Sequence, residues 1–460
     1  MGPCQRRAPP RARQLRASRE KSCNEPALQT LNPRGAAPTK LKEAPTLLSL
    51  SIVMPTLNQR AFLAHAVRSV FAQDLPGLEL VVADGGSRDG TPSLLAELAE
   101  EHPGRLRWVS APDSGPAAAV NRAVALAEGE VIGWLNSDDC YTLGAAARAL
   151  TLLQRDPALV MVYGAGEQID VQGRVLGPYP TRPPATPRAA FAEGCFICQP
   201  TAFFRRATFL ALGALDESLH AAFDFDLWLR LFAAHPGQVA WVPQVQAQSR
   251  CHTDSITARE RERVALEGLQ VLHRHLGYAP PHWLLTHVDE RCAQHPFGPG
   301  SSNLQADLAH LAARAEPLLS PDDRQLVTER LAQNRALQLA TPYLYAGIWP
   351  DGWAPRTLEI RLRQPTPPAM GLRITGTHAH PGGGRTQLTA SAPDGQTFRV
   401  RLANPGPFEW TLPISERLPD AQLVYRITAD RVFVPAALAG QSTDSRELAW
   451  RLDHVALVLA

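Results

Sequence analysis

The chain has 460 residues, which is enough for two or three domains with hydrophobic cores of their own. No run of 18 apolar residues occurs, which argues against a membrane span, and no apolar segment follows the first arginines, which argues against a secretory signal. The seven cysteines are odd in number and widely scattered. Cys195 and Cys198 have redox or zinc spacing but lack a second ligand pair, so we expect ordinary thiols in a reducing compartment.

The net charge of +2 is unevenly distributed. Residues 1–45 carry ten Lys or Arg and three Glu, so this basic head has a charge of +7 and the remainder −5. Its Pro, Ala and Arg bias and its lack of apolar periodicity predict disorder. Contact with an anionic membrane surface or with nucleic acid is one interpretation of the head, and we favour the other, that it has no specific role.

Strands and helices alternate in the pattern from Leu48 to Tyr163. This alternation predicts a mostly parallel sheet with helices on both faces, an α/β fold. We expect Thr91 to cap the second helix with Pro92 at its first position, and Gly129 to close the third. The predicted strands are 48–54, 78–83, 106–110, 131–135 and 159–163, and the predicted helices are 60–73, 91–101, 117–127 and 145–155.

The texture of the chain changes twice after that region. A proline-rich loop at 178–188 precedes a helix that starts near Asp224, and alternating charge with Leu and Ala predicts helices from 257 to 340. After Thr341, short β runs separated by turn residues predict an antiparallel β-sandwich. The expected domains are therefore 46–260, a helical extension at 261–340, and the sandwich at 341–460.

One short apolar run, 131–135, ends after a turn in two adjacent carboxylates, Asp138 and Asp139. Ligands of open α/β sheets bind just beyond the carboxyl ends of the strands. Two carboxylates there are suited to a metal and a phosphate, whereas the alternative is a helix cap. Asp84 ends a second predicted strand, and Pro55 and Thr56 close the first. The pattern therefore predicts a nucleotide-binding edge.

Three segments in this region, 51–58, 82–91 and 133–139, together resemble the family-2-type inverting glycosyltransferases of the GT-A fold. The resemblance covers about residues 48–260. It implies transfer of a sugar from a nucleoside diphosphate sugar, with inversion at the anomeric carbon, and a divalent cofactor, Mg²⁺ or Mn²⁺. A cation with hard oxygen ligands would neutralise the charge that the leaving diphosphate gains.

The resemblance assigns roles to the residues of the acidic turn. By position, Asp139 binds the metal and Asp138 contacts the sugar donor, although the two roles can be exchanged. Asn136 stands where many relatives carry another Asp, so one charge is lost. His252 lies in a later motif whose His approaches the metal or the diphosphate, although a purely structural His is an open alternative, and the usual Lys is replaced by Ile256.

Other positions are predicted to hold the nucleotide. Asp84 matches an Asp that accepts a hydrogen bond from the base, and the alternative is a turn-forming Asp before two glycines. Pro55 and Thr56 would line the same pocket. Asn121 and Arg122 resemble the segment beside the diphosphate, although for Arg122 a solvated helix charge is an open alternative. Asp89 is expected to stabilise its own loop.

The acceptor side is predicted from the helix near Asp224. A base must take the proton of the attacking hydroxyl, and Asp224 aligns with the family's base. Phe223 replaces the Glu that most relatives carry, so Asp226 stays open as the base, and both acids could instead only cap the helix. Gln199 resembles the segment beneath the acceptor pocket.

We therefore expect a cytoplasmic enzyme that uses a UDP-sugar and a glycan or lipid-linked acceptor in polysaccharide or cell-surface glycan synthesis. Peripheral association with the inner membrane face is expected, and a nucleic-acid partner is not. Two alternatives are a catalytically impaired carbohydrate-binding or regulatory relative and a nucleotidyltransferase. The second lacks its expected Gly-rich, Lys-containing loop after the first strand. In the sandwich, which looks similar to accessory domains of polysaccharide-building enzymes, Trp349, Trp353 and Trp410 are either core residues, which we favour, or sugar platforms.

Overall fold

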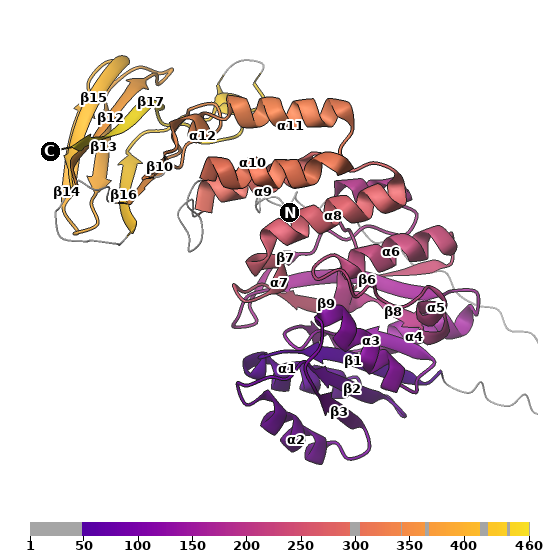
Figure 1. The fold of residues 1–460 in the computed structure, drawn as a ribbon. Helices are drawn as coiled ribbons and strands as arrows, with labels where there is room; N and C mark the ends of the chain where they lie inside the picture. The colour runs from indigo at the N-terminus through magenta and orange to yellow at the C-terminus, as the bar shows by residue number, and fades with distance from the viewer. Residues whose placement is uncertain are drawn as a thin grey trace, which may run out of the picture.

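The computed structural model describes residues 48–294, 304–341, 343–363, 368–414, 422–438 and 442–459 (Figure 1). The predicted basic head, 1–45, lies outside the described residues. Within these ranges no helix is long and apolar enough to cross a membrane.

The first part of the chain forms one nine-stranded sheet with the order β3-β2-β1-β4-β8-β6-β9-β5, and β7 pairs with β6. Strands β3, β2, β1 and β4 are parallel to one another, β6 is parallel to β9, and the remaining pairs, including β4 with β8, are antiparallel. The strands are β1 Leu50–Thr56, β2 Glu79–Asp84, β3 Leu106–Ser110, β4 Val131–Trp134, β5 Cys140–Tyr141, β6 Met161–Ile169, β7 Val175–Pro178, β8 Phe203–Arg205 and β9 Val239–Arg250.

Helices cover both faces of this sheet, as the alternation predicts. Side chains of β1 alternate between two cores, because Ile52 and Met54 point to one face and Val53 to the other. Helices α1, α2 and α4 pack on the first face, and α3 and α6 on the second. The helices of this part are α1 Arg60–Phe71, α2 Thr91–Glu101, α3 Pro116–Leu126, α4 Ala145–Arg155, α5 Arg206–Ala211 and α6 Phe223–Ala234.

Two helix ends differ from the expectation. Gly90, in the left-handed region at φ 88°, occupies the N-cap of α2, and Thr91 is already helical. Its backbone N–H donates to Asp89 at 3.0 Å, so Asp89 stabilises its own loop as predicted. The C-cap of α3 is Ala127 and not Gly129. Gly129 is needed for close approach instead, because a Cβ there would lie 2.5 Å from the backbone nitrogen of Ser51.

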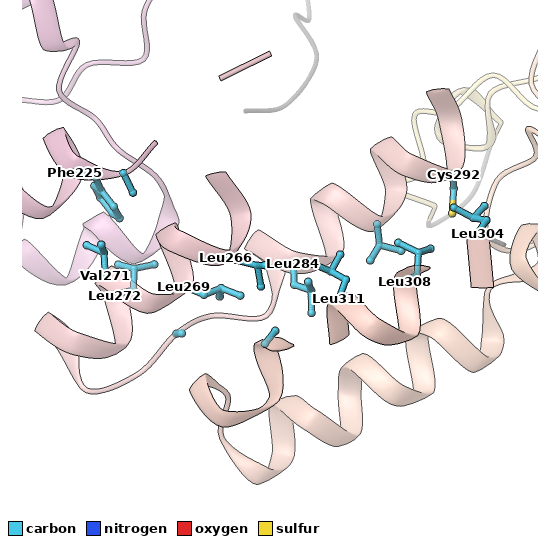
Figure 2. Packing of buried hydrophobic residues seen from close by; sticks show 14 of the residues in the cluster. Phe225, Leu266, Leu269, Val271, Leu272, Leu284, Cys292, Leu304, Leu308 and Leu311 are labelled. Carbon is cyan, nitrogen blue, oxygen red and sulfur yellow. The ribbon is translucent and has the colours of Figure 1, made fainter. Parts of the chain in front are cut away.

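The helical extension packs against the sheet part through α8 (Figure 2). Leu266, Leu269 and Leu272 of α8 are buried with Phe225 of α6 and with leucines of α9 and α10. The ring of Trp283 stacks on Phe225, with ring centroids 5.4 Å apart. The helices of the extension are α7 Ile256–Arg259, α8 Arg261–Leu276, α9 His282–Gln294, α10 Leu304–Ala315, α11 Pro321–Gln333 and α12 Arg335–Leu339.

Two antiparallel sheets form the predicted sandwich, which lies beyond the extension (Figure 1). One sheet has the order β10-β11-β16-β13-β14 and the other β15-β12-β17. Trp349, Trp353 and Trp410 are half-buried. The strands are β10 Leu344–Ala346, β11 Thr357–Arg363, β12 Ala369–His378, β13 Thr386–Ser391, β14 Thr397–Leu402, β15 Gly406–Pro413, β16 Gln422–Ala429 and β17 Arg451–Leu459.

Candidate active site

The carboxyl ends of three neighbouring strands meet at one edge of the sheet. Thr56 of β1 is in register with Asp84 of β2, and Asp84 with Ser110 of β3. The buried Asp84 carboxylate accepts hydrogen bonds from the hydroxyls of Ser87 and Ser110, both at 2.5 Å. Asp84 therefore holds the turn after β2, which is the alternative that the sequence left open. Both interpretations remain compatible, because a carboxylate can accept further hydrogen bonds.

Two buried polar atoms at this edge have no hydrogen-bond partner among the described residues. They are the hydroxyl of Thr56 and one carboxylate oxygen, Oδ2, of Asp113. Gly85 lies directly against Asp113, since a Cβ at Gly85 would be 3.1 Å from that oxygen. Buried polar atoms are nearly always paired, so unpaired ones mark a place where a ligand can bind.

The acidic turn follows β4 and is held by the side-chain amides of Asn136 and Gln199. The Asp139 N–H donates to the carbonyl of Asn136 at 3.1 Å, which forms the turn that two adjacent acids require. The Asn136 side-chain amide donates to Gln199 at 3.0 Å and to Asp139 Oδ2 at 3.3 Å. Gln199 in turn donates to the carbonyl of Trp134 at 2.7 Å. Asn136 and Gln199 thus support the turn from within the fold.

The two acids of the turn have different surroundings. Asp139 is 3% exposed, and its Oδ1 accepts the backbone N–H of Arg250 at 2.8 Å. Burial and the neighbouring Asp138 carboxylate raise the pKa of Asp139 well above its usual value. Asp138 is less buried, and its Oδ2 lies 2.9 Å from Nε2 of His252. The structure therefore pairs the predicted His with Asp138 and not with Asp139.

The His252 side chain is buried and held in one orientation by its neighbours. It is 4% exposed and packs against the ring of Phe62, and its buried Nδ1 has no partner within the part of the chain that the structure describes. Among the described residues, no group of three or more His, Cys, Asp or Glu side chains is arranged to hold a metal ion. Asp138 and His252 thus form a pair. The next residue back, Cys251, has an exposed side chain, unlike the buried Cys140 and Cys198.

Arg250 is a residue that the sequence reasoning missed. Its guanidinium donates from Nε to the carbonyl of Asp138 at 2.8 Å and from Nη1 to the carbonyl of Asp170 at 2.7 Å. It also lies over the ring of Phe62, 4.9 Å from the centroid. Arg250 ends β9, a strand that was not predicted, so only its place two residues before His252 could have drawn attention to it.

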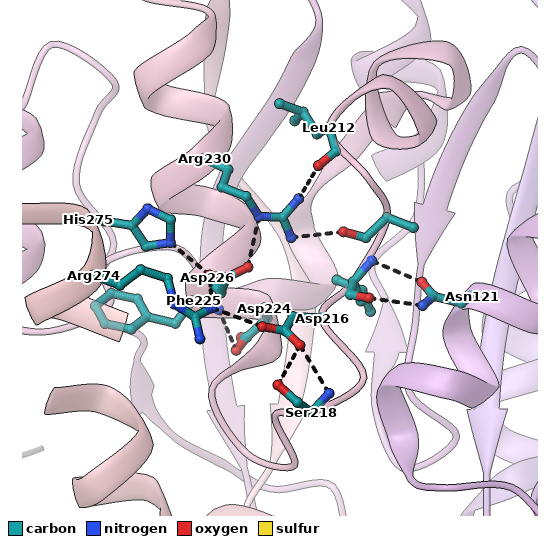
Figure 3. A network of polar contacts seen from close by, with 12 residues as sticks. Asn121, Leu212, Asp216, Ser218, Asp224, Phe225, Asp226, Arg230, Arg274 and His275 are labelled. Carbon is teal, nitrogen blue, oxygen red and sulfur yellow. Dashed lines mark hydrogen bonds and ion pairs between the residues drawn. The ribbon is translucent and has the colours of Figure 1, made fainter. Parts of the chain in front are cut away.

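The two candidate bases, Asp224 and Asp226, both lie at the start of α6 but have different surroundings (Figure 3). Asp226 is 1% exposed and accepts hydrogen bonds from Arg230 and His275, both at 2.7 Å. Burial alone would raise its pKa, but the hydrogen bond from His275 and the charge of Arg230 hold the pKa of Asp226 below its usual value. Asp226 is therefore occupied by partners within the protein.

Asp224 has no such cationic partner among the residues that the structure describes. Its carboxylate accepts the N–H of Phe225 at 2.7 Å, and burial raises its pKa to about 6. A carboxylate with a pKa near the working pH is suited to accept a proton. Asp224 and Asp226 thus lie on the same first turn of α6 in opposite electrostatic situations.

The predicted diphosphate residues make contacts within the protein. The Asn121 amide donates to the carbonyl of Leu215 at 3.0 Å, and its oxygen accepts the N–H of the same residue at 3.0 Å. Arg122 donates to the carbonyls of Ala111 at 3.0 Å and Pro112 at 3.4 Å. Both side chains hold loops of the site, and their contact with a substrate stays a prediction.

Comparison with known proteins indicates which protein family the sheet part of the chain resembles. Residues 51–212 match the model of glycosyl transferase family 2. The chondroitin synthase of Escherichia coli is 30% identical over 201 residues, which are 43% of this chain and 28% of that protein. The hyaluronan synthase of Pasteurella multocida is 29% identical over 182 residues, which are 40% of this chain and 18% of that protein. The chain thus spans less than a third of the length of either relative.

Residues 51–212 therefore match glycosyl transferase family 2, the family that the motifs resemble. Among solved structures, Staphylococcus aureus TarS 1–349 in complex with UDP aligns with 61% of this chain and 86% of that chain, at 17% identity and a TM-score of 0.40. The family assignment rests on the sequence matches, because this TM-score is low.

Proposed function

We propose that the protein transfers a sugar from a nucleoside diphosphate sugar, with inversion, to a glycan or lipid-linked acceptor in polysaccharide synthesis. The observation that carries the proposal is the group of unpaired buried polar atoms at the carboxyl end of β1 and near that of β3, beside the pair of Asp138 and His252. The family match and the synthase relatives support it. A UDP-sugar is the sugar donor that we favour, with Asp84 and Thr56 facing its nucleoside.

The residues present fit a divalent cation. Asp138 offers a carboxylate oxygen, and His252 offers Nε2 if its proton resides on the unpaired Nδ1. Two protein ligands are a normal number for Mg²⁺ or Mn²⁺ that is completed by phosphates and waters. Such a cation would neutralise the departing diphosphate. We therefore assign the metal to Asp138 and His252, the exchanged form of the sequence prediction, with Asp139 supporting the turn.

Asp224 is the base in this proposal. Its raised pKa lets it take the proton of the acceptor hydroxyl as that oxygen attacks the anomeric carbon. Asp226 keeps the helix start in place through Arg230 and His275. The acceptor would approach from the side of α6, opposite the diphosphate, so the product has the inverted configuration.

The proposal is tested by measuring Mn²⁺-dependent binding and turnover across UDP-, GDP- and other nucleotide sugars. Asp138→Asn should weaken metal-dependent nucleotide binding about 10–100-fold. Asp224→Asn should spare binding but slow transfer by about 10²–10⁴-fold. The exposed Asp156→Asn, at the end of α4, is the matched control and should change neither.

Three outcomes would contradict parts of the proposal. Turnover and binding that are both absent with every nucleotide sugar would reject the glycosyltransferase activity. Binding without turnover would favour the catalytically impaired alternative. Loss of metal dependence in Asp139→Asn, with Asp138→Asn unaffected, would return the metal to Asp139.

A further inference from the structure

Glu267 of α8 makes an unusual set of contacts with the segment that leads into α6. Its carboxylate is 9% exposed and accepts the backbone N–H groups of three consecutive residues, 220 to 222. The distances are 3.1 Å from His220, 2.7 Å from Ala221 and 3.0 Å from Ala222. Hydrogen bonds to an ionised acceptor are about twice as strong as neutral ones. This carboxylate therefore fixes the backbone two residues before Asp224.

The same helix contacts this region again about two turns further on, before α6 and in its first turn. Arg274 donates to Asp216 at 2.8 Å, and His275 lies 2.7 Å from Asp226 (Figure 3). Residues seven and eight positions after Glu267 return to the same face of a helix. One face of α8 thus holds the segment 216–226 at both ends.

Close packing makes this contact specific to the sequence of α8. The neighbouring Gly268 lies against the ring of Trp283, and a Cβ at Gly268 would be 2.5 Å from that ring. A larger residue there would push α8 away and pull the Glu267 carboxylate from its three partners. The held segment also lies against the start of α3, two residues after Asp113, since a Cβ at Gly115 would be 2.9 Å from Nδ1 of His220.

From these contacts we propose that Glu267 is a positioning residue for transfer, which orients Asp224 by fixing the backbone of residues 220–222. The proposal rests on the proposed function, because Asp224 is the base there. Glu267 lies outside residues 51–212, the region that matches the family model. Misplacing a catalytic group by about 1 Å can cost on the order of 100-fold in rate, so a residue without contact to substrate can control turnover.

The test is a double-mutant cycle in the full chain, read as kcat for release of nucleotide from the best nucleotide sugar. Glu267→Gln keeps the shape of the side chain but loses its charge. We expect kcat to fall about 10–100-fold while the Kd for the nucleotide changes less than about threefold. In the Asp224→Asn background the same substitution should have no further effect, because a positioning residue acts only through the group that it positions.

Glu262→Gln is the matched control, since Glu262 is also on α8 but is half exposed and paired with Arg314. An equal loss in both backgrounds would reject positioning and make Glu267 merely structural, and an unchanged kcat in the single variant would reject it too. Full activity of Asp224→Asn would reject the base and, with it, the role of Glu267. If Glu267→Gln does not fold, Glu267→Asp, one methylene shorter, is read in the same way.

Discussion

At the scale of single residues, the pH dependence of turnover follows from Asp224. Its pKa is about 6, so it is ionised and able to accept a proton above that pH and protonated below it. We expect kcat, at saturating sugar donor and metal, to fall about tenfold from pH 7 to pH 5. Asp226 does not produce this limb, because its pKa is lowered. A kcat that stays constant down to pH 5, in protein that remains folded, would contradict the base assignment.

The sequence predicted residues that the structure brings together at the acidic turn, and their roles stay predictions. Asp138, Asp139 and His252 were found from motif order, and the structure brings them to one place. Arg250 decides which acid faces outward. Its backbone N–H donates to the Asp139 carboxylate, 111 residues away in the sequence, and so keeps Asp139 inside the fold. Such a contact follows from the pairing of strands far apart in the chain, and no local pattern encodes it.

At the scale of elements, the end of β9 stabilises the acidic turn. Arg250→Met would leave the carbonyls of Asp138 and Asp170 without their charged partner, which should cost about 2–4 kcal/mol. The thermal midpoint of the domain should then fall by roughly 5–15 °C, measured by tryptophan fluorescence. Arg259→Met is the control, because Arg259 is exposed and should change the midpoint little. A wild-type midpoint for Arg250→Met would show that the turn does not need this side chain.

The elements that were predicted are those with a strong local period. Helix α4 has the predicted bounds, and strands β1 to β4 lie within two residues of theirs, because buried runs and amphipathic spacing encode them locally. Strand β9 was missed, since its twelve residues, 239–250, include a proline and alternate irregularly. The half of the sheet that holds His252 therefore could not be built from the sequence.

At the scale of the whole molecule, the proposed role of Glu267 makes the helical extension a part of the site. A chain that ends at residue 340 retains Glu267, Arg274 and His275, so we expect its kcat to stay within about threefold of the full chain. A chain that ends at residue 260 loses these residues and exposes the apolar surface of α6 that α8 covers, so it should be inactive or insoluble. Soluble yield, circular dichroism and turnover distinguish the two. Full activity of the shorter chain would contradict this division.

The order of the domains was predicted from changes in composition along the chain. The contacts between these parts were not predicted. The change to short β runs after Thr341 indicated a sandwich, and two antiparallel sheets are present. The predicted boundary at 260 and 261 divides Glu267 from the backbone of residues 220–222 that it contacts, because these contacts span 45 to 47 residues of sequence. A boundary drawn from composition cannot include such contacts.

The exposed thiol of Cys251 gives this protein a built-in reporter. A bulky thiol reagent attached there would lie one residue from His252, beside the proposed sugar-donor site. Partial burial and the nearby Asp139 carboxylate raise the pKa of Cys251, so its labelling should be slow at neutral pH and faster in mild alkali. With Cys4 and Cys23 replaced by serine, protection of this one thiol by a nucleotide sugar would follow occupancy in real time, without any knowledge of the acceptor.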